Sequence, residues 1–413
     1  MNDFHYIGLD VHKKTIQYCI KQADGKLVRE GRIGATLAEL TEWAASLRHP
    51  WKGALEATMF SGWIYDALLP YAAELKVAHS AMLKAIAASK HASDRLDARM
   101  ICDLVRTGLI AGVWMAPPEL RAMRMQLRYR NLVVRQATQT KNRIASTLME
   151  QGVEYSKPKL HGKRYFQQLL GQLGHLPEAV RLTLRYSRGS VDMCNTTQAL
   201  LIKSLNANPK LSARLDLLRT IPGVGQITAL TWALEIGDPH RFRSASKAMS
   251  YCGLVSPLQE SAGKRYRQPL SKKRNAHLQS MLIEAAHLVP RYHPALKTLY
   301  DQTRQQSNAG VAAILVARKL VSYLLCVDKS GQAFQQRPTE TAQDPPTGET
   351  AFPSEPPIGS AVIARRSSPS RVRSAAAKAA APLTSPGRRA AKVSAMGGSG
   401  GKAKVHCNRS LQS

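Results

Sequence analysis

The segment Tyr6–Lys14, with the sequence YIGLDVHKK, is the stretch around which the N-terminal part of the chain is expected to fold. Residues 4–9 have the length and the apolar composition of a buried β-strand, and Asp10 follows where that strand should end. Because an isolated buried carboxylate is costly, an acid at this place indicates a metal ion or a basic partner. The alternative is a turn-forming Asp that caps a hairpin.

The segments that follow alternate between strand-like and helix-like patterns. Ala23-Asp24-Gly25 is a hairpin turn signal, and Thr36 is the expected N-cap of a helix. We expect, in order, strands over 15–21 and 26–33, a helix over 36–47, a strand over 53–57, a helix over 61–75, a strand over 76–79, a short helix over 82–88 and a helix from residue 93. This order is typical of a mixed sheet flanked by helices, so it predicts an α/β domain over residues 1–112.

Four acids of this domain are candidates for one metal site. Besides Asp10, Glu56 interrupts an apolar strand, and Asp94 and Asp97 are spaced i, i+3, which places them on one face of a helix. Carboxylates that meet at a sheet edge suit Mg²⁺, and two such ions can clamp a phosphodiester. For Asp94 and Asp97 alone, a solvated helix N-terminus is the alternative, because the helix dipole favours acids there.

The charge of the chain indicates a polyanionic partner. Its 413 residues include 59 Lys and Arg against 28 Asp and Glu, which gives a formal charge of +31. The 11 Lys and Arg residues that follow Glu355, with no acid among them, leave +20 on residues 1–355, so the excess is not confined to the end of the chain. Such an excess favours nucleic acid as the partner, ahead of an anionic membrane.

The cysteines and the apolar runs bear on the compartment. The six cysteines are scattered, with no CxxC pair and no nearby His to complete a zinc set, so they are expected to be thiols in a reducing compartment. No apolar run approaches the length of a membrane span, and the first residues lack the pattern of a signal sequence. We therefore expect a cytoplasmic protein with no membrane partner.

Residues 113–210 are expected to form a helical linker or arm. Basic residues interleave there with apolar ones such as Leu127 and Ile144 at helical spacing, and few acids balance them. A long charged helix with a solvated face is one interpretation. The excess of cations favours instead an arm that contacts nucleic acid or dimerises. The nucleic-acid-binding candidates on it are Arg128, Arg135, Lys141 and Arg143.

A second, mainly α domain is expected over residues 211–332. In Thr220–Ala229, TIPGVGQITA, Gly223 and Gly225 would free the backbone to approach a phosphate, as in a helix-hairpin-helix turn, although such a turn often only joins two packed helices. Residues 309–325 read as a last core helix, and residues 333–413 as a disordered basic tail. Six cations near the segment 260–267, ESAGKRYR, could neutralise a phosphate transition state: Lys264, Arg265, Arg267, Lys272, Lys273 and Arg274.

Three motifs of the N-terminal domain resemble those of a family of insertion-sequence transposases, which includes the pilin-gene invertases and the bridge-RNA-guided recombinases. The motifs are GLDVHK around Asp10, LEAT around Glu56, and SDRLDAR around Asp94 and Asp97. The resemblance covers about residues 4–330 and implies a RuvC-like domain of the ribonuclease-H fold, in which these four DEDD acids are catalytic and bind Mg²⁺. Ala92 stands where the family has a Lys.

The C-terminal segments resemble the transposase domain of the same family, which carries a nucleophilic serine. By its position relative to Gly253-Leu254 and Pro257, Ser261 is the matching residue, although a Ser in a Gly-containing loop is by itself more often a turn residue. No His/Asp pair is placed by the sequence to act as its base. The departures from the family here are Ala262 for a second serine, Arg274 for a Gly and Gln279 for an Arg.

The resemblance thus implies a transposase or DNA recombinase that moves its own insertion sequence through a covalent serine–DNA intermediate. It also implies a bridge RNA that pairs with donor and target DNA, and a homo-oligomer, a tetramer, that is nucleoid-associated in the bacterial cytoplasm when bound to DNA. Two alternatives stay open. One is a RuvC-like metal-dependent nuclease or Holliday-junction resolvase that uses water as nucleophile, and the other is a non-catalytic nucleic-acid-binding protein.

Overall fold

A computed structural model describes residues 4–80, 82–83, 94–261 and 264–335, with the side chains of residues 258–267 excepted. All of these residues belong to one compact unit. The predicted tail, Ala92, Ala262 and most of the predicted helix over 82–88 lie outside the described residues.

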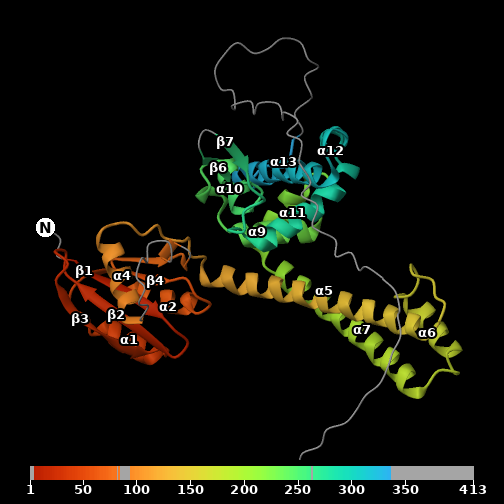
Figure 1. The fold of residues 1–413 in the computed structure, drawn as a ribbon, viewed down its shortest axis with the longest axis horizontal. Helices are drawn as coiled ribbons and strands as arrows, with labels where there is room; N and C mark the ends of the chain where they lie inside the picture. The colour runs from red at the N-terminus through yellow and green to blue at the C-terminus, as the bar shows by residue number, and fades with distance from the viewer. Residues whose placement is uncertain (1–3, 81, 84–93, 262–263, 336–413) are drawn as a thin grey trace, which may run out of the picture. The chain divides into compact units, whose positions relative to one another are not determined.

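The N-terminal domain is built on a five-stranded mixed sheet in the order β3-β2-β1-β4-β5 (Figure 1). The first three strands form an antiparallel meander, whereas β4 and β5 run parallel to β1. This is the mixed sheet that the sequence predicts. The strands are β1 (His5–Val11), β2 (Thr15–Lys21), β3 (Leu27–Gly34), β4 (Trp51–Glu56) and β5 (Glu74–Ala78).

Three described helices cover this sheet: α1 (Leu37–Ala45), α2 (Ser61–Leu68) and α4 (Asp94–Arg106). The Thr36 side chain accepts a hydrogen bond from the Glu39 amide, which confirms the predicted N-cap of α1. The predicted helix over 61–75 is wrong in its second half. It ends at Leu68, and a 3₁₀ turn, Leu69–Tyr71, follows, because Pro70 cannot donate a helical hydrogen bond.

Alternation along β1 sends its side chains to two different layers. Ile7, Leu9 and Val11 are buried in the core that α1 and α2 share with the sheet. Gly8, between them, faces α4: a Cβ built on it would lie 2.1 Å from the Ala98 carbonyl oxygen and 2.3 Å from the Cys102 amide nitrogen. Helix α4 therefore lies directly against β1, and only a glycine permits this approach.

Residues 118–206 form the predicted helical arm. Helices α5 (Pro118–Glu150) and α7 (Glu178–Asn206) run side by side, and α6 (Lys163–Gln172) packs at their far end (Figure 1). Ile144, Phe166 and Leu184 belong to the small core at that end. The arm is thus long enough to hold its own apolar cluster, separate from the cores of the two domains.

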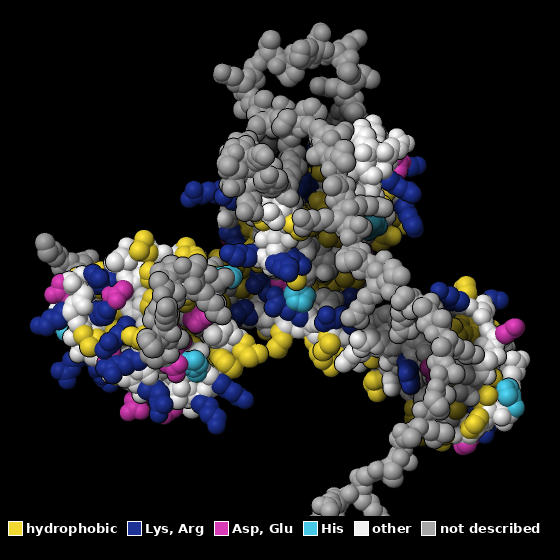
Figure 2. All heavy atoms as spheres, viewed as in Figure 1, with side chains coloured by type: hydrophobic (Ala, Val, Ile, Leu, Met, Phe, Trp, Pro, Cys, Tyr) yellow, Lys and Arg dark blue, Asp and Glu magenta, His cyan; other side chains and the backbone are white. Residues whose placement is uncertain are grey.

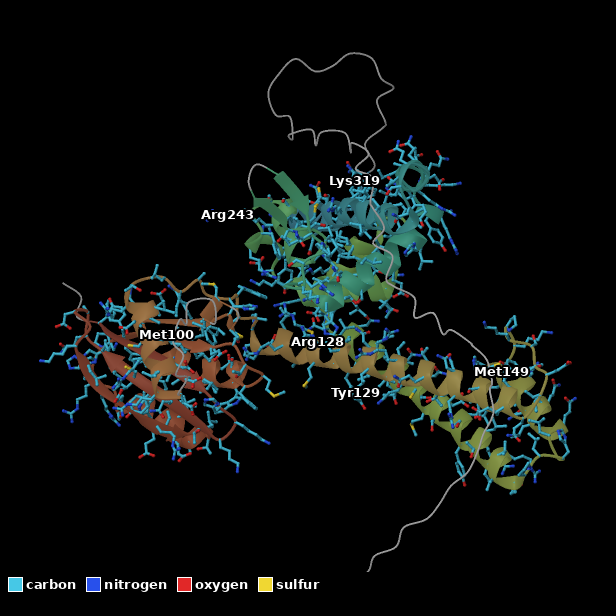
Figure 3. The ribbon with its side chains drawn as sticks, in the orientation of Figure 1. Met100, Arg128, Tyr129, Met149, Arg243 and Lys319 are labelled. Carbon is cyan, nitrogen blue, oxygen red and sulfur yellow. The ribbon has the colours of Figure 1, made fainter. Side chains whose placement is uncertain are left out.

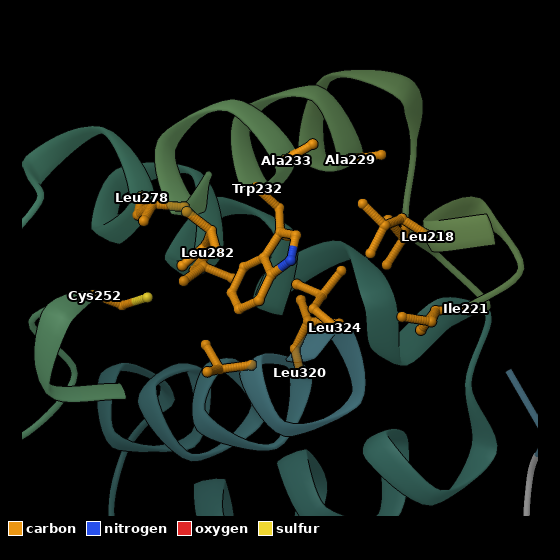
Figure 4. Packing of buried hydrophobic residues seen from close by; sticks show 14 of the residues in the cluster. Leu218, Ile221, Ala229, Trp232, Ala233, Cys252, Leu278, Leu282, Leu320 and Leu324 are labelled. Carbon is orange, nitrogen blue, oxygen red and sulfur yellow. The ribbon is translucent and has the colours of Figure 1, made fainter. Parts of the chain in front are cut away.

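The C-terminal region is mainly helical and packs around Trp232 (Figure 4). The Trp232 indole is fully buried and donates a hydrogen bond of 2.9 Å to Asp328. One antiparallel hairpin, β6 (Leu258–Ser261) and β7 (Lys264–Arg267), interrupts the helices. The helices are α8 (Pro209–Arg219), α9 (Gln226–Ile236), α10 (Ala245–Tyr251), α11 (Ala276–Leu288), α12 (Pro294–Gln306) and α13 (Ala309–Ser330), with 3₁₀ turns at Pro239–Arg241 and Val289–Arg291.

Helix α13 is long and apolar enough to cross a membrane by length and composition, so the expectation that no apolar run approaches the length of a membrane span is wrong. Half of its most apolar window is buried inside the protein. Val316, Leu320 and Leu324 belong to the core around Trp232. A core helix of a globular domain passes the same test of length and composition, so α13 is weak support for a membrane span.

Candidate metal centre and nucleic-acid interface

The sheet brings the first two predicted acids to one edge. Strands β1 and β4 are parallel neighbours, and Leu9 is in register with Leu55. Asp10 and Glu56 therefore follow at the same level, at the carboxyl ends of both strands. Asp10 is 4 % exposed, whereas Glu56 is half-buried. The alternative of an exposed turn cap for Asp10 is wrong, because the residue lies within β1 and is buried.

Helix α4 brings the other two acids to the same edge. Asp94 and Asp97 lie in its first turn, exposed and half-buried respectively, and α4 packs on the face of β1 toward which Asp10 points. Two arginines of the same helix pair with Glu30 of β3, with Arg99 bidentate at 2.7 and 2.9 Å and Arg95 in contact with it. Figure 3 shows α4 at the label of Met100. The ion pairs and Gly8 together fix α4, and with it both acids, over the sheet.

His12 joins this group, although the sequence reasoning did not include it. Its Nε2 lies 2.9 Å from Asp10 Oδ2 and 3.4 Å from Asp94 Oδ1. One ligand atom from each of Asp10, His12 and Asp94 lies within 4.8 Å of the others. The signal that could have found His12 is its spacing, because residues i and i+2 of a strand project to the same side.

The electrostatics of the site favour a cation. Burial raises the pKa of Asp10, His12 opposes this rise, and the carboxylates of Asp94 and Asp97 add to it. Burial by itself would lower the pKa of His12, but Asp10, Asp94 and Glu56 raise it overall. All four predicted acids thus act on one small volume. A bound cation would offset both the cost of burying the charged Asp10 carboxylate and the repulsion among the carboxylates.

The donor set fits a divalent ion. Carboxylate oxygens are the ligands of Mg²⁺ and Mn²⁺, and an imidazole nitrogen is compatible with Mn²⁺ and other transition metals. Asp10 is held from one side only: the described residues give its carboxylate one hydrogen-bond partner, His12. Its other lone pairs are available to a metal ion.

The cationic candidates on α5 differ in their surroundings. Arg128 donates two hydrogen bonds of 2.8 Å to Glu235 of α9, which is fully buried, and Asn275 donates a third at 2.8 Å. Figure 3 labels Arg128 where α5 meets the C-terminal helices. Arg135 and Arg143 are exposed and Lys141 is half-buried. Arg128 therefore joins the arm to the C-terminal domain, whereas Arg135 and Arg143 have side chains free to face a ligand.

The Arg128–Glu235 pair gives a prediction for stability. Arg128→Met should lower the free energy of unfolding at pH 7 by about 3 kcal/mol, because it leaves a buried carboxylate without its cation. Arg135→Met, an exposed cation two turns further along α5, should change it by less than about 0.5 kcal/mol. The double variant Arg128→Met/Glu235→Gln should recover most of the loss. Urea unfolding measures all three, and an unchanged Arg128→Met would contradict a structural role for the pair.

The same pair sets a dependence on pH. Burial alone would raise the pKa of Glu235, but the hydrogen bonds from Arg128 and Asn275 and the charges of Arg128 and Arg124 hold it below its usual value. A carboxyl with a lowered folded pKa stabilises the protein above its unfolded pKa, and this contribution is lost as the pH falls through the folded pKa. The wild type should therefore lose stability below about pH 4.5 through this group. The difference in the free energy of unfolding between Arg128→Met and the wild type should therefore become smaller as the pH falls below about 4.5.

The remaining predicted residues lie in the C-terminal region. Gly223 has a φ of +84°, which favours glycine, in the turn between α8 and α9, and Gly225 is the N-cap position of α9.

Ser261 is the last residue of β6 and is paired with Lys264 in β7, the strand that also carries Arg265 and Arg267. Lys272, Lys273 and Arg274 are exposed in the segment before α11. Gln279, in place of the expected Arg, is buried and donates a hydrogen bond of 2.6 Å to the Gly253 carbonyl.

Two family models match the chain over these same regions. A model of the DEDD transposases of the IS110 kind, described as "Transposase", matches residues 7–151. A second, described as "Transposase IS116/IS110/IS902 family", matches residues 215–301. The first span contains Asp10, Glu56, Asp94 and Asp97, and the second contains the β6–β7 hairpin.

Individual relatives agree with these models. The transposase for insertion sequence element IS1111A of Coxiella burnetii is 26 % identical over 298 residues, which cover 71 % of this chain and 79 % of the relative. The transposase for element IS1328 of Yersinia enterocolitica is 23 % identical over 80 % of this chain and 98 % of its own length. The pilin gene-inverting protein of Moraxella bovis is 30 % identical over 32 % of this chain and 42 % of its own.

The fold, the acidic site and these matches define the class of the protein: it is a DNA-cutting enzyme of the transposase kind. Within that class, the chain belongs to the IS110 family of DEDD transposases. Membership of this family implies DNA as a partner and the use of a divalent metal ion.

Proposed function

We propose that this protein is the transposase of an insertion sequence, which cuts and rejoins DNA at a composite site. The observation that carries the proposal is the group of Asp10, His12 and Asp94 at the carboxyl end of β1, with Glu56 and Asp97 close enough to act on it electrostatically. We retain residues 1–112 as the DEDD domain, 113–210 as the arm and 211–332 as the domain with the nucleophile.

The acids would hold Mg²⁺, with Asp10 as the central ligand because it is the buried member of the group. A bound divalent ion supplies charge stabilisation to the attacking and leaving oxygens of a phosphodiester. For His12 to join the ligands, its ring must release the proton that the surrounding carboxylates favour. The exposure of Asp94 and His12 leaves the site open on the side from which DNA would approach.

Ser261 would supply the nucleophile. Its Oγ would lose its proton and form a bond to the DNA phosphorus as a phosphodiester P–O bond breaks, and the leaving DNA oxygen would take up a proton to become a free hydroxyl. The covalent serine–DNA intermediate thus keeps the bond energy for rejoining without ATP, by the reverse attack of a DNA hydroxyl. The cations Lys264, Arg265 and Arg267 share its hairpin, and Lys272, Lys273 and Arg274 follow within seven residues of that hairpin. Their charges would stabilise the phosphorane-like transition state. The helix-hairpin-helix-like turn at Gly223 and Gly225 would bind the DNA backbone.

A guide RNA and an oligomer complete the proposal. The formal charge of +31 and the exposed cations Arg135 and Arg143 suit nucleic-acid partners, and a bridge RNA would select donor and target DNA by base pairing. Joining several DNA ends calls for several active sites, which a tetramer would provide. The relative that inverts a pilin gene suggests that inversion of a DNA segment is within reach of the same chemistry.

The serine is tested by Ser261→Ala. We expect this variant to form no covalent protein–DNA adduct and no recombined product, while binding DNA within about twofold of the wild type, because the hydroxyl is the only group removed. Adducts are counted on a denaturing gel with end-labelled element DNA, and Ser256→Ala is the matched control. If Ser261→Ala still recombines DNA, the assignment of Ser261 as the nucleophile is wrong. If it no longer recombines DNA but cuts it with water as nucleophile as fast as the wild type, the plain nuclease is the better interpretation.

The guide is tested with the RNA that copurifies with the full chain. We expect its removal by ribonuclease to stop recombination and its return to restore it. Recombination at an unchanged rate after ribonuclease treatment would remove the guide from the proposal.

A further inference from the structure

A cavity of about 720 Å³ lies beside the Arg128–Glu235 pair and is lined from three parts of the chain. His79 and Val113 come from the N-terminal domain and the segment after it, Arg128 comes from α5, and Tyr251 and the segment 273–277 come from the C-terminal domain. Its volume is within the usual range of sites for small molecules.

The walls of the cavity are tied together by hydrogen bonds and stacking. The Val113 amide donates to the Val77 carbonyl at 2.7 Å, which joins the segment 111–113 to the sheet. The next residue, Trp114, stacks against the guanidinium of Arg241, 4.6 Å from its ring centre. Arg124 donates hydrogen bonds to the backbone oxygens of Leu234 and Glu235 at 2.6 and 3.1 Å. The cavity is therefore a built feature with connected walls.

The lining is strongly cationic. Arg128, Arg241, Lys273 and Arg274 all contribute to it, and the one described acid in contact with this group, Glu235, is buried behind Arg128. Figure 2 shows dark blue side chains gathered around a histidine in the region where α5 meets the C-terminal helices. Four cations around one cavity, with one buried acid to balance them, favour an anionic ligand.

Arg241 has one buried hydrogen-bond donor that is unpaired among the described residues. Its Nε donates to the Ile236 carbonyl at 3.2 Å, and its guanidinium lies over Phe242 and Tyr251 at 4.2 and 4.4 Å from their ring centres. Its Nη2 is buried and has no hydrogen-bond partner among the described residues. An unpaired buried donor of a charged group is costly, so a ligand oxygen at this place would remove a real penalty.

The cavity also offers flat and apolar surfaces. The ring of Tyr251 and the side chains of Met82 and Val113 line it, with Ala276 at the start of α11. Burial is the main cause that lowers the pKa of His277. Glu235 opposes this shift, whereas Arg128 and Arg135 add to it, so the surroundings favour the neutral ring, which can pack on a base. Aromatic and apolar walls beside cations are what an unpaired nucleotide needs, since its base stacks while its phosphate pairs.

We propose that this cavity binds one unpaired nucleotide of a nucleic-acid strand, with its phosphate at Arg241 and Lys273 and its base against Tyr251 and His277. The inference rests on the proposed recombination of DNA, in which strands are exchanged and nucleotides leave the duplex. It adds a place where the protein holds an extruded nucleotide, and this place shares Lys273 and Arg274 with the cations proposed to act beside Ser261. The nucleotide could belong to DNA or to the RNA partner, because both supply the same phosphate and base chemistry.

The experiment uses the full chain carrying Asp10→Asn, so that no strand is cut. Single-stranded DNA with one 5-iododeoxyuridine, RNA of the same sequence with 5-iodouridine, and both as duplexes with their complements are irradiated with the protein. The cross-linked peptides are then identified by mass spectrometry. We expect cross-links at Tyr251 or His277 with a single strand, at least about fivefold above the duplex, and the stronger of the DNA and RNA arms names the source.

Three further variants make the test specific. Ala276→Leu should narrow the space beside Tyr251 and His277 and lower these cross-links about tenfold. Lys273→Gln should weaken single-strand affinity about fivefold. Lys247→Gln is the matched control, because Lys247 is an exposed cation of the same domain that does not line the cavity, and it should stay within about twofold. Circular dichroism confirms that each variant is folded.

Cross-links that avoid Tyr251 and His277, or that Ala276→Leu leaves unchanged, would overturn the inference. A parallel recombination assay with the protein that retains Asp10 separates this failure from that of the proposed function. If recombination proceeds without these cross-links, the cavity has another role and the proposed function stands. If the protein binds neither single strands nor duplexes, both the inference about the cavity and the proposed function are wrong.

Discussion

Asp10→Asn is expected to reduce DNA cleavage and recombination by about 1,000-fold, because metal assistance contributes several kcal/mol to such reactions and each 1.36 kcal/mol is a factor of ten. Asp10 is the buried member of the acidic group, and its carboxylate has His12 as its hydrogen-bond partner. Asn keeps the shape of the side chain and removes its charge. The variant should therefore bind DNA nearly as well as the wild type while losing the chemistry.

Two measurements make this prediction independent of activity. In the metal-free protein, Asp10→Asn should unfold at the same temperature as the wild type or higher, because it removes a carboxylate whose charged form burial disfavours. Added Mg²⁺ or Mn²⁺ should raise the unfolding temperature of the wild type and have little effect on the variant, since a ligand stabilises only the state that binds it. The matched control is Asp216→Asn, at an exposed acid of α8 that is remote in sequence from the site. A variant that retains full activity would exclude the acidic group as the metal site.

Gly8→Ala is expected to lower the free energy of unfolding by about 3 kcal/mol and to stop DNA cleavage as well. The added methyl group would fall 2.1 Å from the Ala98 carbonyl oxygen and 2.3 Å from the Cys102 amide nitrogen, both of which are backbone atoms of α4. No change of side-chain rotamer can relieve this overlap. Helix α4 must move away from β1, and Asp94 and Asp97 move with it.

The control for this substitution is Gly189→Ala. Gly189 lies within α7, and a Cβ built on it meets nothing within 4 Å. Alanine is the better helix former, so this variant should be unchanged or more stable by up to about 1 kcal/mol. Urea unfolding and cleavage of labelled DNA compare the two variants. A fully active Gly8→Ala protein would show that the position of α4 is not what brings the acids together.

The sequence predicted the architecture of the N-terminal domain well because that domain is built from local patterns. The alternation in β1 and the Thr36 cap can each be recognised within a few residues. The boundary at Leu68 was missed because the apolar pattern continues into β5, so that only Pro70 marks the end of the helix. The motifs single out the four acids as candidates. The parallel order of β1 and β4 brings Asp10 and Glu56 to one sheet edge, and the packing of α4 against β1 brings Asp94 and Asp97 there.

The segment YIGLDVHKK by itself determined a buried strand that ends in an acid, because residue type and period suffice for that. Only the tertiary structure decided the rest of its role: that Gly8 is the contact point for α4, and that His12 lies between Asp10 and Asp94. The same holds for Arg128, whose partner Glu235 is 107 residues away in a helix that is buried from Ala229 to Ile236. A sequence shows which charges a chain carries, but long-range packing decides whether a charge faces solvent, a metal ion or a buried partner.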